Sequence, residues 1–116
     1  MDLLHKQCAP CEGGVDPLQP NEIKKYFGLL EEGWKVIDNK RIEKSYKFDD
    51  FRQALAFTNL VGEIAEIEGH HPDIELGYGN VKLTLSTHSI NGLSINDFIV
   101  AAKADESLSR QSQACY

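Results

Sequence analysis

The clearest pattern in the chain is an alternation of apolar and polar residues on both sides of a short turn signal. The alternation runs through residues 73–78 and again through residues 81–88, and a two-residue period is typical of half-buried β-strands. Gly79-Asn80 separates the two segments and suits a two-residue hairpin turn, because both residue types tolerate a positive φ. The pattern predicts an antiparallel hairpin in which residue 78 faces 81 and, by extension, His71 faces His88.

The remaining segments show the periods of three helices and a second hairpin. Helix-start signals stand at Pro20-Asn21, at Asp49 and at Ser94 with Asp97 three residues on. Gly69 follows the middle helix in the position of a left-handed C-cap. The predicted elements are a helix at 21–31, strands at 34–38 and 41–48 joined around 38–40, a helix at 50–68, the hairpin above, and a helix at 95–105.

This order of elements, α-ββ-α-ββ-α, predicts the fold class. Two hairpins form one four-stranded antiparallel sheet, and helices cover one of its faces, which is a two-layer α+β architecture. A chain of 116 residues has the length of one domain. We expect this domain to cover residues 20–106, with residues 1–19 as an N-terminal arm and residues 107–116 as a polar, frayed tail.

Charge and composition argue against several classes of partner. A net charge of −6 and a pI near 5.1 disfavour a nucleic-acid backbone, which needs clustered Lys and Arg. No segment approaches the ~20 apolar residues that span a bilayer, and the first residues lack the apolar core of a signal peptide. We therefore expect a cytoplasmic protein that binds neither nucleic acid nor membrane. Its polar sheet face and apolar helices are compatible with a homo-oligomer.

The predicted arm carries a Cys-x-x-Cys motif, Cys8 and Cys11, and Cys115 stands next to the C-terminus. Three cysteines in a protein expected to be cytoplasmic do not describe a disulfide framework. The two thiolates and His5 would supply three of four zinc ligands, and a thioredoxin-like role would place the motif at the start of a helix rather than in a glycine-rich loop. We favour a mobile or loosely docked arm over a metal or redox function.

His70, His71 and His88 are the strongest candidates for chemistry. The ordinary pKa of an imidazole, about 6.5, lets converging histidines supply an acid and a base near neutrality without a metal. Glu66 lies one helical turn before His70, so it could hydrogen-bond an imidazole and raise the pKa of that ring by favouring the charged form. The alternatives are functionless surface histidines and a solvated Glu66. Asp97, by its position, is a helix-start residue rather than a catalyst.

Taken together, these residues resemble the signature of the pterin-4a-carbinolamine dehydratase family. The matching positions are Glu66-x-x-x-His70-His71-Pro72, Tyr78, Thr84-Leu85-Ser86-Thr87-His88, Gly92-Leu93-Ser94 and Asp97, with Trp34, Phe48 and Asp50-Phe51 upstream. The resemblance covers about residues 20–104. Gly69 stands where some relatives carry an acidic residue, and Ile74 stands where an aromatic residue is frequent. The Cys-x-x-Cys arm lies outside the resemblance.

The resemblance implies dehydration of a 4a-hydroxytetrahydropterin to quinonoid dihydropterin, which recycles the tetrahydrobiopterin of aromatic amino-acid hydroxylases. It also implies a homodimer or homotetramer and a reaction without metal or cofactor. We expect His70 and His88 to act on the leaving hydroxyl or on N5, His71 to orient the substrate or share the proton transfer, and Glu66 to tune His70. The site residues that follow are catalytic His70, His71, His88 and Glu66, and substrate-binding Ser86, Thr87, Pro72 and Asp97.

Two other classes of function remain open from the sequence. Animal members of the family also act as dimerisation partners of a transcription factor through a helical surface, so a non-catalytic scaffold module with a regulatory partner is the main alternative. The second is a metal site built from the histidines and Glu66.

Overall fold

The computed structural model describes residues 3–6, 8 and 16–113, and its elements follow the predicted order. The bounds are α1 Pro20–Phe27, β1 Lys35–Ile37, β2 Arg41–Lys47, α2 Phe51–Glu68, β3 Asp73–Gly77, β4 Asn80–Leu85 and α3 Ile95–Gln113, with 3-10 helices η1 Leu3–His5 and η2 His88–Ile90. The α-ββ-α-ββ-α order and the α+β class are confirmed.

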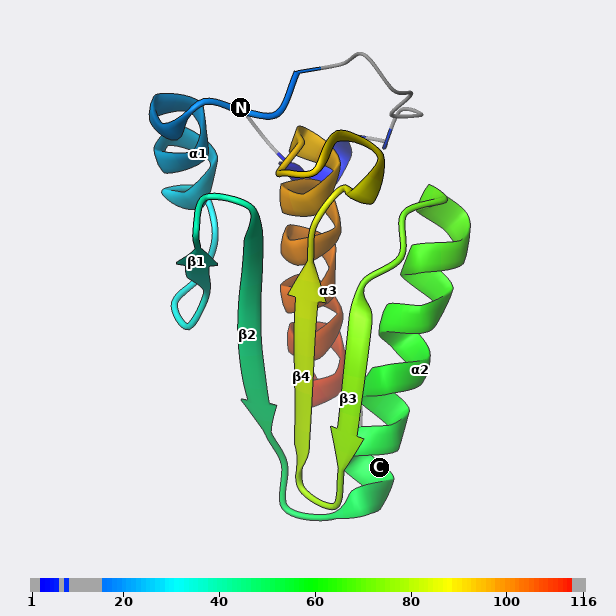
Figure 1. The fold of residues 1–116 in the computed structure, drawn as a ribbon. Helices are drawn as coiled ribbons and strands as arrows, with labels where there is room; N and C mark the ends of the chain where they lie inside the picture. The colour runs from blue at the N-terminus through cyan, green and yellow to red at the C-terminus, as the bar shows by residue number, and fades with distance from the viewer. Residues whose placement is uncertain (1–2, 7, 9–15, 114–116) are drawn as a thin grey trace.

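The four strands form one antiparallel sheet in the order β1-β2-β4-β3. In Figure 1, α3 lies behind the sheet and α2 runs along it beside β3, and the two helices contact each other. Alternate side chains of β2 and β4, such as Ile42 and Leu83, are fully buried against Phe57 of α2 and Phe98 of α3. The other face of β2 is polar, so the sheet buries one side and leaves the other to solvent.

The second hairpin has the predicted strands but a different register. Gly77 lies opposite Asn80, so Tyr78 and Gly79 form the turn, and the predicted pairing of residue 78 with 81 is wrong by two residues. A shift of two keeps every side chain on its predicted face, because the strand period is two. The predicted ladder pairing of His71 with His88 is also wrong, since β4 ends at Leu85 and His88 lies in η2.

A close backbone contact explains the position of this turn. The Phe48 N–H donates to the Gly79 carbonyl at 2.9 Å, and a Cβ on Gly79 would lie 2.7 Å from the Phe48 oxygen. Neither Gly79 nor Asn80 has a positive φ. A glycine is therefore required at residue 79 because a side chain there would clash with the segment that leads into α2. A turn with positive φ is found instead in the first hairpin, where Asp38 and Asn39 have φ of 53° and 55°.

Three helix boundaries differ from the prediction. α1 ends at Phe27 rather than near residue 31, because its chain turns at Gly28. The N-cap of α2 is Asp50, whose side chain accepts the Gln53 N–H at 2.9 Å, rather than Asp49. α3 continues to Gln113, eight residues beyond the predicted end at 105. Buried Asp105 and Ser107 keep this part of α3 packed against the domain, so the predicted tail at 107–116 begins as helix.

A buried polar cluster joins α3 to the first hairpin. Asp105 accepts hydrogen bonds from Trp34 Nε1 at 2.9 Å, Lys44 Nζ at 2.8 Å and the Tyr46 hydroxyl at 2.6 Å. Burial, reinforced by the Asp105 charge, raises the pKa of Tyr46, so its hydroxyl stays protonated and donates. Such a carboxylate is stable inside the fold because its lone pairs are satisfied.

The described part of the N-terminal arm packs on the domain. Leu3 is buried and belongs to the core, η1 contacts α3, and the Cys8 N–H donates to Glu68 Oε1 at 2.9 Å. These described residues are docked on the domain, and Cys11 lies outside the described residues. Across the described ranges, the helices are too short or too polar to cross a bilayer.

Candidate active site

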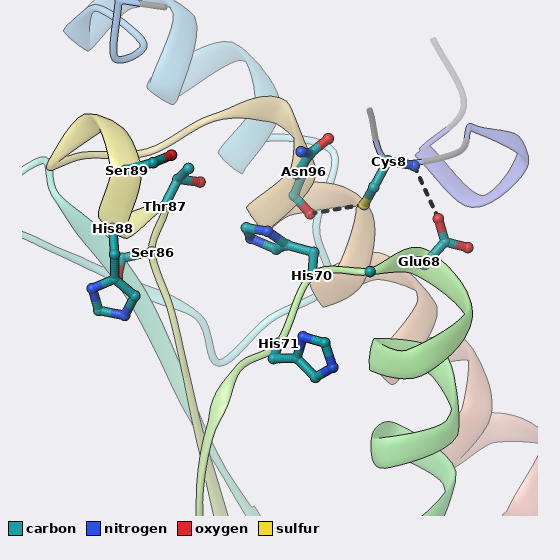
Figure 2. A pocket seen from close by; sticks show the side chains of 10 residues that line it. Cys8, Glu68, His70, His71, Ser86, Thr87, His88, Ser89 and Asn96 are labelled. Atoms are coloured by element: carbon teal, nitrogen blue, oxygen red, sulfur yellow. Dashed lines mark hydrogen bonds between the residues drawn. The ribbon is translucent and has the colours of Figure 1, made fainter. Parts of the chain in front are cut away.

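A cavity of about 470 Å³ opens where the C-terminal end of α2, the end of β4, η2 and the start of α3 meet. His70, His71 and His88 all line it, and we call it the histidine pocket. Its volume falls in the range of about 300–1,000 Å³ that small-molecule sites occupy. Figure 2 shows His88 on one side of the pocket and His70 and His71 on the other.

The end of α2 places His70 in the pocket. Gly69 has φ 68° and ψ 26°, the left-handed conformation of a helix C-cap, as predicted. The N–H groups of Gly69 and His70 both donate to the Ala65 carbonyl, at 2.9 and 3.2 Å. These two hydrogen bonds end the helix and turn the chain. His70 therefore points toward the start of α3 rather than continuing along the face of α2.

His70 is paired with a buried carboxylate. His70 Nε2 lies 2.6 Å from Asp97 Oδ1, and the two side chains are 13% and 0% exposed. Asp97 Oδ2 accepts the Thr87 hydroxyl at 2.8 Å and the Ser94 N–H at 3.0 Å. The predicted helix-start role of Asp97 is thus confirmed by the Ser94 contact, but the same carboxylate also holds the His70 ring.

This network fixes which nitrogen of His70 a ligand can meet. A carboxylate only accepts hydrogen bonds, so the proton between the pair lies on His70 Nε2 and Nδ1 remains for a ligand. Thr87 Oγ1 also lies 2.8 Å from Ser94 Oγ. This second contact holds the Thr87 hydroxyl in the position from which it bonds Asp97. An imidazole held in one tautomer by a buried carboxylate is the arrangement that acid–base enzymes use.

His71 rather than His70 is the partner of Glu66. His71 Nε2 lies 2.5 Å from Glu66 Oε2, with side chains 60% and 78% exposed. Glu66 thus contacts an imidazole as predicted, but the expectation that it tunes His70 is wrong, because the turn at Gly69 directs His70 away from α2 and leaves His71 beside it. An ion pair this exposed is worth little free energy, and Glu66 lines a separate hollow on α2, not the histidine pocket.

The other predicted residues divide between the pocket and its surroundings. Ser86 and Thr87 line the pocket at the end of β4, and Thr87 is buried with its hydroxyl bonded to Asp97. Pro72 is not among the lining residues, and Asp97 lies beneath His70 rather than at the cavity surface.

Five lining residues were not predicted as part of the site: Cys8, Glu68, Gly69, Ser89 and Asn96. Cys8 comes from the N-terminal segment, which no local pattern connects to this site, and Glu68 is the last residue of α2. Burial, together with the Glu68 charge, raises the pKa of the Cys8 thiol to about 12, so the thiol stays protonated at neutral pH and is a poor nucleophile or metal ligand. Within the described ranges, no three His, Cys, Asp or Glu side chains converge as metal ligands.

Comparison with known proteins identifies similar chains along most of the sequence. The profile of the family described as "Pterin 4 alpha carbinolamine dehydratase" matches residues 16–107. A protein of Alkaliphilus metalliredigens named "Putative pterin-4-alpha-carbinolamine dehydratase" is 50% identical over 90% of this chain and 95% of its own length. A protein of the same name from Rubrobacter xylanophilus is 46% identical over 90% of this chain and 96% of its own.

Two solved structures share the fold. A crystal structure described as a "transcriptional coactivator/pterin dehydratase from Brucella Melitensis" is 34% identical, with a TM-score of 0.73 over 78% of this chain and 97% of that one. A "pterin dehydratase-like protein" described as a RuBisCO assembly factor in the alpha-carboxysome is 23% identical, with a TM-score of 0.56 over 66% of this chain and 89% of that one. At that identity, the second likeness concerns the fold alone.

Proposed function

The chain belongs to the pterin-4a-carbinolamine dehydratase family, and on this premise we propose that it catalyses loss of water from a 4a-hydroxytetrahydropterin in the histidine pocket. One observation carries the proposal: the His70 imidazole is backed by the fully buried Asp97 and shares a cavity with His88.

The reaction needs only proton transfers. A proton is delivered to the 4a-hydroxyl, the C4a–O bond breaks and water leaves. N5 then loses its proton, its electron pair forms the C4a–N5 double bond, and the product is quinonoid dihydropterin. One acid and one base on opposite sides of a small cavity meet these needs, since each can contribute about 10²–10⁴-fold in rate.

The pocket residues take the following roles. His70, with Nε2 fixed on Asp97, exchanges a proton through Nδ1, and His88, on the other side of the pocket, is the second acid–base group. His71, more exposed at the rim and paired with Glu66, orients the substrate. Ser86 lines the pocket as a polar contact, whereas Thr87 positions Asp97 rather than the substrate because its hydroxyl is already bonded.

The setting that follows is a cytoplasmic step that regenerates a reduced pterin for an aromatic amino-acid hydroxylase. The protein would act as a homodimer or homotetramer. β3 is an edge strand, and the Ile67 side chain on the neighbouring helix α2 is 80% exposed, so apolar surface remains for a second copy to cover.

The direct experiment is a dehydration assay on carbinolamine generated in situ by a hydroxylase. The wild-type protein should raise the rate of dehydration well above the spontaneous rate, and His88→Ala should lower kcat by about 10²-fold while the circular dichroism spectrum is unchanged. A folded wild-type protein that leaves the spontaneous rate unchanged would refute the proposal.

That negative result would favour the second candidate, a non-catalytic interaction module. The exposed apolar side chains of α2, Ile67 and Leu55 at 80% and 40% exposure, support this candidate. Ile67→Asp separates the two functions. It should abolish binding to a partner or a second copy that contacts Ile67. It should leave the dehydration rate unchanged, because Ile67 does not line the histidine pocket.

A further inference from the structure

The segment before α1 is anchored on both sides of residues 9–15. On one side, buried Leu3 inserts into the core and the Cys8 N–H is bonded to Glu68. On the other side, the Leu18 N–H donates to the Leu93 carbonyl at 2.9 Å. Both anchors lie on elements that build the histidine pocket, namely the end of α2 and the loop that leads into α3.

The anchor at Glu68 is a partly buried ionic clamp. Glu68 Oε1 accepts the Cys8 N–H, and Oε2 lies 2.6 Å from Lys103 Nζ. The two charged side chains are 7% and 19% exposed. Burial by itself would raise the pKa of Glu68, but the hydrogen bonds from Lys103 and Cys8 outweigh it and the pKa lies below its ordinary value. The carboxylate is therefore charged at neutral pH and holds the segment in place.

The clamp brings the Cys8 side chain to the pocket that His70 lines. Cys8 Sγ lies 3.7 Å from the carbonyl oxygen of Asn96, and both residues line the cavity. Figure 2 shows Cys8 beside Asn96 on the α2 side of the pocket, near His70. The thiol is a small, uncharged group there, which a hydrophobic or aromatic part of a ligand can approach without losing a hydrogen bond.

We propose that Cys8, held by Glu68 and Lys103, forms one wall of the substrate site and is a specificity-determining residue that limits the size of the pterin. The inference rests on the proposed dehydratase function. In this role Cys8 contacts the substrate through its bulk, and no thiolate chemistry is involved.

Variants of different size at residue 8 test the wall. Cys8→Trp should raise the KM for the carbinolamine and the Kd for biopterin about tenfold or more, because the larger side chain enters the cavity. Cys8→Ser should stay within about twofold, since the size is nearly unchanged. Leu4→Trp is the control, because it places the same tryptophan side chain at an exposed residue near Cys8 in the sequence that does not line the pocket.

Alkylation of Cys8 by iodoacetamide gives a second readout in a Cys11→Ser, Cys115→Ser protein, and it is followed over a long incubation at alkaline pH because the raised pKa of the thiol makes the reaction slow. Saturating biopterin should slow the reaction, because bound pterin covers the thiol. Lys103→Met should speed it on the order of tenfold, since Glu68 then loses its charged partner and releases Cys8 more often. Thermal melts verify that each variant is folded.

The outcomes separate this inference from the proposed function. If the wild-type protein turns over the carbinolamine but Cys8→Trp matches Leu4→Trp in KM and Kd, or biopterin leaves alkylation of Cys8 unchanged, the wall is refuted and the dehydratase stands. If Cys8→Trp does not fold, the alkylation result decides alone. A wild-type protein that neither turns over nor binds a pterin overturns both.

Discussion

His70 and His71 are adjacent in the sequence but lie in opposite surroundings. His70 is mostly buried and bonded to a carboxylate with no solvent exposure, whereas His71 and Glu66 are both well exposed. A buried charge is expensive unless every lone pair is satisfied, and Asp97 meets this condition through His70, Thr87 and Ser94. The Asp97 contact should therefore matter for catalysis and the Glu66 contact should not.

Asp97→Asn tests this difference. The amide keeps the shape of the side chain but cannot hold His70 Nε2–H as a carboxylate does, so kcat should fall by about 10²-fold. The pH–rate profile should also change shape, which a purely structural role of Asp97 would not cause. Stopped-flow absorbance under saturating substrate gives both quantities.

Glu66→Gln is the matched control for that experiment. It removes the same charge from an exposed imidazole partner, so kcat should stay within about threefold. A large loss in Glu66→Gln together with wild-type kinetics in Asp97→Asn would reverse the roles assigned to the two carboxylates.

At the residue scale, the sequence predicted which histidines line one pocket but not which carboxylate hydrogen-bonds His70. The family pattern and the helix end brought His70, His71 and His88 to one pocket. The helical spacing of Glu66 and His70 was misleading, because the left-handed Gly69 ends the helical geometry between them. Asp97 carried a signal for a helix start only, and its second role depends on a tertiary contact that spacing cannot reveal.

At the scale of elements, the end of α2 is the feature that orients the site. Gly62 and Gly69 allow a matched test, since a Cβ at either would meet no atom within 4 Å. Gly62→Ala should stabilise the fold by up to about 1 kcal/mol, because alanine favours a helix interior. Gly69→Ala should destabilise it by about 1–2 kcal/mol, because its φ of 68° is unfavourable for alanine. Urea denaturation measures both.

The direction of each stability change tests the role assigned to the two glycines. If Gly69→Ala were neutral, the left-handed C-cap would not be a constraint on the chain that leads to His70. If Gly62→Ala were destabilising, steric crowding in the middle of α2 would be the cause, contrary to the open space found there.

Most elements were predictable because their patterns are local. The alternation of Val81 and Leu83 and the capping role of Gly69 depend on neighbouring residues alone. The register of the second hairpin depended on Phe48, which approaches Gly79 from another part of the chain. The length of α3 depended on the partners of Asp105 in the first hairpin. Both errors concern contacts that are remote in sequence.

At the scale of the whole molecule, Asp105 connects α3 to the first hairpin through Trp34, Lys44 and Tyr46. Asp105→Ala would leave three donors without their acceptor, one of them a charged lysine that is 13% exposed. The free energy of unfolding should fall by about 3–5 kcal/mol. Urea denaturation followed by tryptophan fluorescence is suitable, because Trp34 reports on the same cluster.

Glu63→Ala serves as the comparison for Asp105. Glu63 is an exposed residue of α2, and its loss should change stability by no more than about 0.5 kcal/mol. Equal effects of the two substitutions would mean that the Asp105 cluster adds nothing beyond a surface charge.

The central claim is that the Asp97-backed imidazole of His70 transfers the proton in dehydration. Single-turnover dehydration by His70→Ala, with and without added imidazole, tests it most directly. We predict a rate about 10²-fold below wild type that free imidazole raises again in a concentration-dependent way, because the vacated space lies beside Asp97. A folded His70→Ala protein with a wild-type rate, or one whose loss does not respond to imidazole, would contradict the account.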